Sequence, residues 1–144
     1  MIEKDTVRLL RECDAGAKMG VEAINDMVDD VKSDELRGLL NSSMREHRAL
    51  AGDIREHLNR FEDRGKDPPM VASAMSRLKT RAELMMNPGD RTVADLMTDG
   101  CNMGVKSLSR YLNQYKAADE RSKDCAKKLI AMEEKLTKDI RPYL

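Results

Sequence analysis

The 144-residue sequence has no surplus of charge of either sign, because 26 Lys and Arg residues balance 26 Asp and Glu residues. A general nucleic-acid-binding protein needs a basic excess to displace counterions from phosphates, so we do not expect nucleic acid as a partner. The sequence also lacks a run of about 18 apolar residues, and its first positions carry Glu3, Lys4 and Asp5. We therefore expect neither a membrane span nor a secretory signal.

Cysteine is scarce, with three residues and no paired spacing: Cys13, Cys101 and Cys125. This usage is typical of a reducing compartment, so we expect a cytoplasmic protein. A zinc site would need two or more ligands close in sequence. Because all three cysteines fall on or beside apolar stripes, we interpret them as small buried hydrophobic residues.

Hydrophobic residues make up 40% of the chain and charged residues 36%, whereas aromatic residues make up only 3%. The apolar residues recur at steps of three and four, which is typical of amphipathic helices. The sequence therefore predicts an all-α fold in a single domain over residues 1–144. Long helices are predicted over residues 5–31, from 34 to the break at 64–65, from 90 or 92 to 115, and over 119–140, with a short helix over 70–86.

The lengths of the connections predict the topology. Two or three residues join the first two long helices, and a similarly short link joins the last two, so each pair is expected to form an antiparallel hairpin. About 30 residues, including the short helix, separate the hairpins, which is enough to run the length of a bundle. Asp5 or Thr6 is expected to cap the first helix, Ser33 the second, and Thr92 with Asp95 the third long helix.

An internal repeat supports two equivalent hairpins. The segment 16–21 recurs at 100–105 with four of six residues identical. In the second helix of each hairpin, an offset of 86 aligns Leu50 with Leu136 and His47 with Glu133. We interpret this as a duplicated hairpin, which implies a pseudo-two-fold axis and allows His47 and Glu133 to face each other across the core.

With these features the chain resembles the ferritin-like superfamily, and more closely an uncharacterised bacterial family of ferritin-like four-helix bundles. The closer likeness rests on four short motifs: Asp14-Ala15-Gly16, Ser33-Asp34-Glu35-Leu36, Glu46-His47, and Gly65 followed by Pro68. The resemblance implies a ferritin-like antiparallel four-helix bundle of two hairpins joined by a long crossover.

Metal-binding members of that superfamily supply a Glu from each of two helices and Glu-x-x-His from the other two. Most of these positions have lost their ligand in this chain: Met44 stands in place of a Glu, Leu136 in place of a His, and Gly20 and Gly104 at or near the positions on the other two helices. An intact di-iron centre is therefore not expected, and we predict no catalytic and no cofactor-binding residue. If a metal does bind, we expect iron or manganese at a reduced set of ligands: His47, Glu46, Glu133 and Asp14.

Glycine costs roughly 1 kcal/mol inside a helix, so the matched glycines of the repeat need a compensating reason. Gly16 and Gly20 lie along one edge of the first helix, as Gly100 and Gly104 do along the third long helix. Our hypothesis is that these two helices touch at the glycines, where a metal would otherwise lie. A direct pair between Asp14 and His47 is not favoured, because the two differ by about 6 Å in axial height.

Methionine is abundant, with 11 residues, and several cluster around the crossover: Met70, Met75, Met85, Met86, Met97 and Met103. We interpret them as core filling, with an adaptable surface for a partner as the alternative. The predicted short helix carries an apolar side: Val71, Ala74, Met75, Leu78, Ala82 and Met85.

The preferred function is a non-enzymatic structural or protein-interaction module that forms a homodimer through the crossover region. The alternative is a ferritin-like or rubrerythrin-like metal-binding or redox protein with a reduced ligand set. A third hypothesis is a small apolar ligand in a pocket lined by Met44, His47 and Met103.

Overall fold

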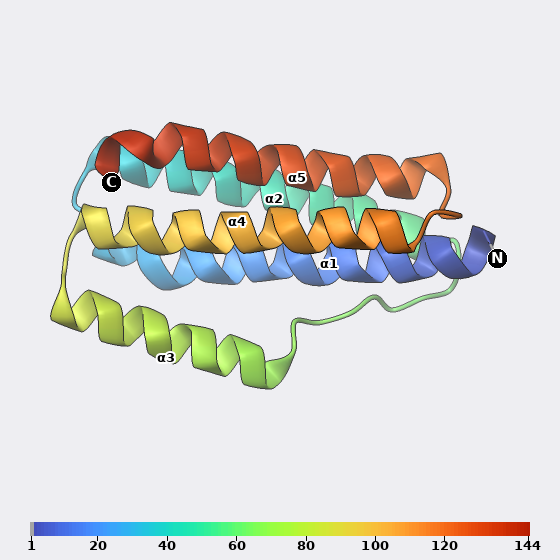
Figure 1. Cartoon of the computed structure of the whole chain (residues 1–144), viewed down its shortest axis with the longest axis horizontal. Coiled ribbons are helices and arrows are strands. Elements are labelled where there is room, and N and C mark those ends of the chain that lie inside the picture. The colour runs from blue at the N-terminus through green and yellow to red at the C-terminus, as the bar shows by residue number, and fades with distance from the viewer. Residues whose placement is uncertain (1) are drawn as a thin grey trace.

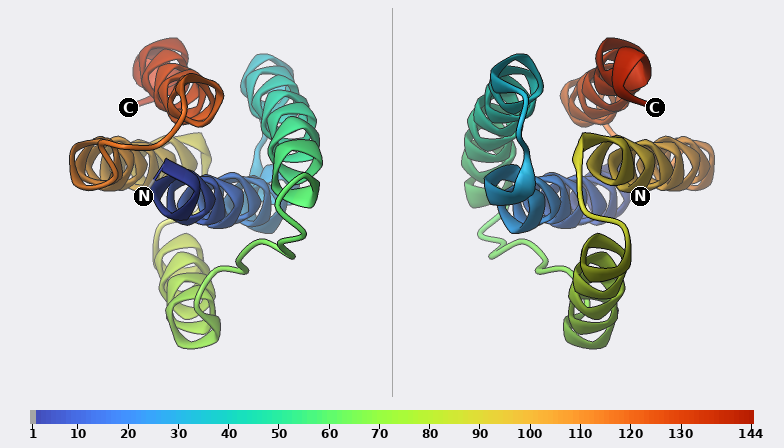
Figure 2. Two further views of the ribbon diagram at one scale, coloured as in Figure 1. Left: turned by 90° about the vertical axis from the view of Figure 1, so that its right-hand side faces the viewer. Right: turned by 90° about the vertical axis from the view of Figure 1, so that its left-hand side faces the viewer.

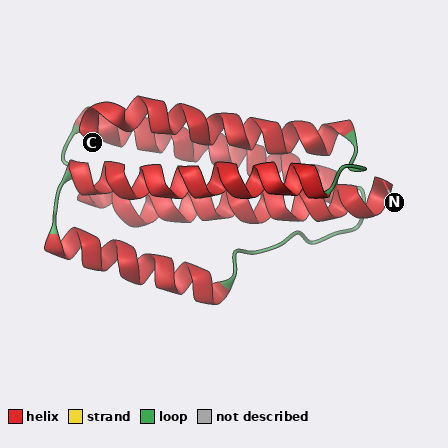
Figure 3. Ribbon diagram, viewed as in Figure 1, coloured by secondary structure: helices red, strands yellow, loops and turns green. Residues whose placement is uncertain are grey.

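The computed structural model describes residues 2–144, except for the side chain of Val71, and this part of the chain contains helices and no strand (Figure 3). The prediction of an all-α fold is therefore confirmed. The α-helices are α1 (Ile2–Met27), α2 (Asp34–Asn59), α3 (Met70–Met86), α4 (Asp90–Gln114) and α5 (Glu120–Ile140). Short 3-10 turns follow α1 and α5: η1 (Val28–Asp30) and η2 (Arg141–Tyr143).

The four long helices lie side by side, and α3 lies outside them (Figures 1 and 2). Helix α1 packs on α2 and α4 packs on α5, so each short connection joins two antiparallel neighbours. The two hairpins contact each other where α1 meets α4 and where α2 meets α5, and α1 also reaches α5 across the centre. The larger contacts between helix α3 and this four-helix body are with α1 and α4.

Buried apolar side chains form two clusters, one toward each end of the four long helices. Leu10, Leu58 and Leu129 belong to the first cluster, and Ile24 and Ile140 belong to the second. Each such side chain contributes roughly 1.5–3 kcal/mol when it is fully removed from water. All three cysteines are buried and free, as predicted.

The boundary between the two clusters falls at four positions, one on each long helix: Gly20, His47, Gly104 and Glu133. On α2, Leu40 belongs to the second cluster and Leu50 to the first, with His47 between them. On each of the other three long helices, the buried apolar residues before and after the named position also belong to different clusters. The middle of the body is therefore built from two glycines and two ionisable side chains.

Capping is predicted correctly only for α2, where the Ser33 hydroxyl accepts the backbone N–H of Leu36 at 3.2 Å. The predicted caps of the first helix are wrong, because α1 begins earlier and both side chains bind the α4–α5 connection instead. Asp5 accepts the N–H of Ala117 at 3.1 Å, and Thr6 accepts the N–H of Asp119 at 2.8 Å. The backbone donors of a tight connection need partners, and α1 supplies them from the other hairpin.

The predicted cap of the third long helix is also wrong. Helix α4 follows Gly89, which provides no side-chain cap, and Asp90 faces away from its own helix. The Asp90 carboxylate accepts the backbone N–H groups of Lys32 at 2.7 Å and Ser33 at 3.0 Å. It therefore joins the start of the second hairpin to the turn of the first.

The crossover after α2 is bound to α1 by ion pairs. The Arg11 guanidinium donates to the Asp63 carboxylate at 3.0 Å, and Lys66 pairs with Glu12 at 2.6 Å. These ion pairs hold the first part of the crossover against α1. They thereby set the position in space at which α3 starts.

No helix in residues 2–144 combines the length and the apolar character that crossing a membrane would require.

Candidate functional site

A buried histidine–glutamate pair occupies the middle of the four-helix body. His47 is 1% exposed and Glu133 is 8% exposed. The Nε2 atom of His47 lies 2.7 Å from Oε1 of Glu133, and its Nδ1 atom lies 2.7 Å from the carbonyl oxygen of Ser43. A carbonyl oxygen can only accept a hydrogen bond, so Nδ1 carries a proton and the second proton lies between Nε2 and the carboxylate.

The environment of His47 favours its charged form. Burial lowers the pKa of the imidazole, but the hydrogen bond and the charge of Glu133, together with the Ser43 carbonyl, outweigh burial and leave the pKa above its ordinary value. The contact with Glu133 therefore stabilises the protonated form of the His47 imidazole, although both side chains are buried. The predicted placement of these two residues across the core is confirmed.

Glycine on the facing helices makes room for the pair. A Cβ added at Gly20 would lie 2.7 Å from Cδ2 of His47, and one at Gly104 would lie 3.6 Å from the carboxyl carbon of Glu133. Helices α1 and α4 contact each other, as predicted, but the atoms nearest a Cβ at Gly20 and at Gly104 belong to the pair, and Gly100, which the hypothesis also included, is exposed with no atom within 4 Å of its Cβ position. The imidazole ring fills the space that the absent Gly20 side chain leaves.

The cysteine beside the pair is not an activated nucleophile. Burial raises the pKa of the Cys101 thiol, and the neighbouring Glu133 carboxylate raises it further. The thiol therefore stays protonated, and Cys101 remains a small buried residue. A substrate could reach this cluster only if the helices separated, because His47 and Glu133 are both buried.

The structure brings together only two of the four candidate metal ligands. Glu46 is exposed on the outer side of α2. Asp14 is buried elsewhere, where Oδ2 accepts Lys18 Nζ at 2.8 Å and the N–H of Lys66 at 3.0 Å. This confirms that Asp14 and His47 do not pair directly.

A two-metal centre does not fit the residues at mid-height, because His47 and Glu133 bind each other and glycine stands on both facing helices. Within residues 2–144, no group of three or more His, Cys, Asp or Glu side chains is arranged to hold a metal ion.

Substitution of Gly20 tests whether the absence of a side chain there is needed to accommodate the His47 ring. Gly20→Ala is expected to lower the free energy of unfolding by about 1–3 kcal/mol, because two hydrogen bonds hold the ring that the new methyl group would meet. Gly100→Ala, at the repeat-related edge of α4, is the matched control. No atom lies within 4 Å of its Cβ position, so it should stabilise the protein by up to about 1 kcal/mol. Urea unfolding measures both changes, and equal effects would contradict this account of Gly20.

A second histidine binds the end of α2 to the start of α5. Nε2 of His57 lies 3.1 Å from Oδ2 of Asp119, whose other oxygen caps α5 by accepting the N–H of Ser122 at 2.8 Å. Burial raises the pKa of Asp119, but the hydrogen bonds to Ser122 and the contact with His57 outweigh it and lower that pKa overall. The position of His57 on the apolar side of its helix predicts that it is buried. No local pattern in the sequence identifies Asp119 as its partner.

Five of the nine exposed large apolar residues of the described chain lie on α3. Its buried side chains are Thr80 and Leu84, which face α1 and α4. The large apolar residues are exposed instead: Met70, Met75, Leu78, Met85 and Met86. Val71 belongs to the same predicted side, but its side chain lies outside the described residues.

The interpretation of the clustered methionines as core filling is therefore wrong for most of them, although Met97 is buried. Met103 is 70% exposed, whereas His47 is buried, so the two cannot line one internal pocket. The hypothesis of an apolar ligand between Met44, His47 and Met103 is wrong for that reason.

In the three comparisons that we made, the chain matches no family model, no curated protein and no solved structure. Its function must therefore be inferred from the geometry of its own residues.

Proposed function

We propose that this protein is a non-enzymatic interaction module with a ferritin-like four-helix bundle, and that it forms a homodimer through α3. The observation that carries the proposal is the row of large apolar side chains that α3 leaves exposed: Met70, Met75, Leu78, Met85 and Met86. A continuous exposed apolar face of this kind is typical of an interaction surface, whereas single exposed apolar residues are not.

The row is nearly symmetric about Leu78, the central residue of α3. In an antiparallel pair with Leu78 against its copy, Met70 lies opposite Met86 and Ala74 opposite Ala82. Large side chains then meet large ones, and alanine meets alanine, where two helices can approach closely. A two-fold interface needs a surface that is complementary to itself, and these pairs have that property; Met75 is the exception, since its mirror position is Arg81, which pairs with Asp30.

The size of the row also fits a dimer interface. Its five large residues are each between 65% and 86% exposed. They present several hundred Å², on the order of the roughly 800 Å² that each partner buries in a standard interface. Burial of that much apolar surface in a second copy is a favourable process, because water is released from it.

Two of the three basic residues of α3 form ion pairs with the body, and the third, Lys79, is exposed. Arg77 pairs with Asp26 at 3.4 Å, and Arg81 pairs with Asp30 at 2.8 Å. Because both acids belong to the first hairpin, these ion pairs keep the arginines away from the exposed row. They thereby limit repulsion between like charges in a dimer.

The ferritin-like arrangement and the duplication are supported by the pairwise match at mid-height. Gly20 packs on His47, and the repeat-related Gly104 packs on the repeat-related Glu133. The long crossover with its own helix connects the two hairpins, as the resemblance implies (Figure 1).

The oligomeric state tests this proposal. We expect the native protein to elute with twice the 16.3 kDa mass of one chain, and Met75→Glu with Leu78→Glu to elute as a monomer, because two carboxylates would be buried in the interface. Ala72→Glu with Ser76→Glu places the same charge on exposed positions outside the row and should stay dimeric. Size-exclusion chromatography with light scattering measures the masses. A monomeric native protein at about 100 µM would refute the dimer.

A further inference from the structure

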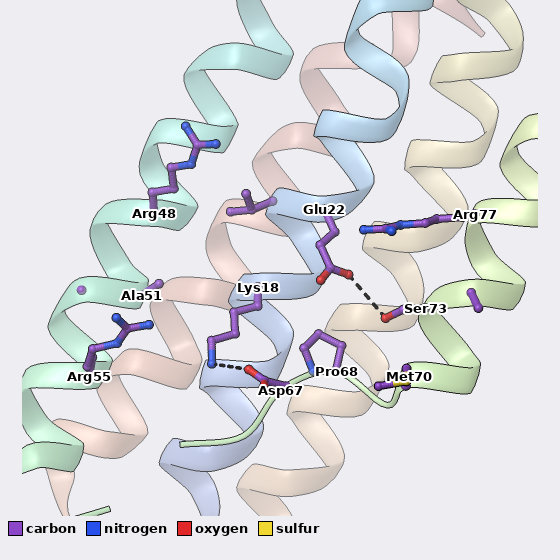
Figure 4. A pocket seen from close by; sticks show the side chains of 13 residues that line it. Lys18, Glu22, Arg48, Ala51, Arg55, Asp67, Pro68, Met70, Ser73 and Arg77 are labelled. Atoms are coloured by element: carbon purple, nitrogen blue, oxygen red, sulfur yellow. Dashed lines mark hydrogen bonds and ion pairs between the residues drawn. The ribbon is translucent and has the colours of Figure 1, made fainter. Parts of the chain in front are cut away.

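A groove of about 750 Å³ lies between α2 and α3, with α1 as its floor (Figure 4). Residues 67–68 of the crossover close part of one side. This volume lies within the range of about 300–1,000 Å³ that small-molecule sites occupy. The walls on α1 and α2 lie outside the apolar row of α3, whereas Met70 and Ala74 of that row also line the α3 side of the groove.

Positive charge is concentrated on the α2 wall. Four cationic and two acidic side chains line the groove: Lys18, Arg48, Arg55, Arg77, Glu22 and Asp67. Most of this charge is compensated. Lys18 binds Asp14 at 2.8 Å and Asp67 at 2.9 Å, and Arg77 pairs with Asp26, which lies outside the lining.

Arg48 and Arg55 are different, because neither forms an ion pair with another residue of the described chain. They lie two helical turns apart on the same side of α2, which corresponds to roughly 10 Å along the helix. Glu22 points toward Ser73 of α3, at 3.4 Å, and so away from this wall (Figure 4). An anion would therefore be attracted to the two arginines, of which Arg55 also acts on the Asp67 carboxyl and helps to lower the pKa of that group.

Between the two arginines the groove has low walls and an apolar lining. Ala51 and Gly52 line the groove there on α2, and Val21 of α1 and Pro68 of the crossover line it as well. No atom lies within 4 Å of the position where Gly52 would carry a Cβ. The open length of about two helical turns is too short for an extended helix–helix interface but suits a small molecule.

We infer that this groove binds a small amphipathic anion: a carboxylate or phosphate group on an apolar chain, with the anionic group at one of the two arginines, Arg48 or Arg55, and the chain over Ala51 and Gly52 between them. Arginine donates several N–H groups in a planar fork that matches both kinds of head group. The adjacent apolar floor removes the chain from water, which a purely ionic ligand would not need. The inference does not depend on the dimer.

Isothermal titration with decanoate and with decyl phosphate, below micelle formation, tests the inference and identifies the preferred head group. Arg48→Gln with Arg55→Gln should weaken binding about tenfold or more, because the charge-assisted contacts of the head group are lost. Arg45→Gln, an exposed arginine of α2 outside the groove, is the matched control and should leave the affinity unchanged.

A steric test uses two equivalent glycines of α2. Gly52→Leu should abolish binding, because the side chain fills the groove. Gly38→Leu should not, although it also has no atom within 4 Å of its Cβ position. Equal binding of decyltrimethylammonium, equal binding of inorganic phosphate, or unchanged affinity in Gly52→Leu would each overturn the inference. The mass of each variant in solution is measured in parallel, so a loss of the dimer is distinguished from a loss of the groove.

Discussion

Replacing Glu133 by alanine is expected to lower the free energy of unfolding by about 3 kcal/mol or more near pH 6. The substitution leaves His47, which is 1% exposed, without the carboxylate that binds its Nε2 atom. Few single substitutions in this chain should cost as much, since most surface changes stay within about 0.5 kcal/mol. Glu134→Ala, at the neighbouring exposed position, is the matched control. Urea unfolding followed by circular dichroism measures both.

A double-mutant cycle separates the pair from the packing around it. His47→Leu combined with Glu133→Leu should recover most of the stability that either single change loses, because an apolar pair leaves no buried charge. If the two single effects simply add, the two side chains are not coupled, and the account of the pair is wrong.

The pH dependence has a definite sign. The folded pKa of His47 is raised above its unfolded value of about 6.5, so the protein binds this proton more tightly when folded. The stability from the pair is fully present below that unfolded pKa and is lost as pH rises through the folded pKa. The difference between the native protein and Glu133→Ala should therefore shrink as the pH rises above about 6.5. A difference that grows with pH would contradict a charged His47.

The second large effect is expected at the crossover, where Gly65→Ala should cost about 3 kcal/mol. Gly65 has a φ of 83°, in the left-handed region that alanine adopts only with strain. A Cβ there would also collide with Oδ2 of Asp14, the atom that accepts the N–H of Lys66 and the Lys18 ammonium. The substitution would therefore strain the turn and disrupt the contacts of a buried carboxylate.

The collision and the strain can be measured separately. In an Asp14→Ala background, Gly65→Ala should cost only the left-handed strain, about 1–2 kcal/mol, because the colliding oxygen is gone. Chemical unfolding of the two single variants and the double variant gives the coupling. An unchanged cost in both backgrounds would show that Asp14 does not limit the space at Gly65.

The sequence alone determined the secondary structure because its signals are local. Apolar spacing identifies the long helices, and the Asp67-Pro68-Pro69 and Asn87-Pro88-Gly89 breaks frame α3, whose predicted range matches its observed bounds. The repeat also placed His47 and Glu133 at equivalent heights, which is why their contact could be anticipated. Burial of the cysteines follows from the same spacing.

The tertiary structure alone decided which partners the polar groups have. Asp5, Thr6 and Asp90 are good capping residues by type, yet each binds backbone donors of the other hairpin. Asp14 binds a turn that lies about 50 residues further along the chain. Such contacts depend on which segments meet in space, and no local pattern records that.

The orientation of α3 is the clearest example. Periodicity shows that its apolar residues share one side, but it does not show which side faces the body. Leu84 joins the second core cluster, and the two arginines pair with Asp26 and Asp30, so α3 packs by its polar side and leaves the methionines exposed. The sequence therefore determined the helix and its two faces. The long-range ion pairs of the two arginines and the packing of Leu84 decided which of these faces is exposed to solvent or to a partner.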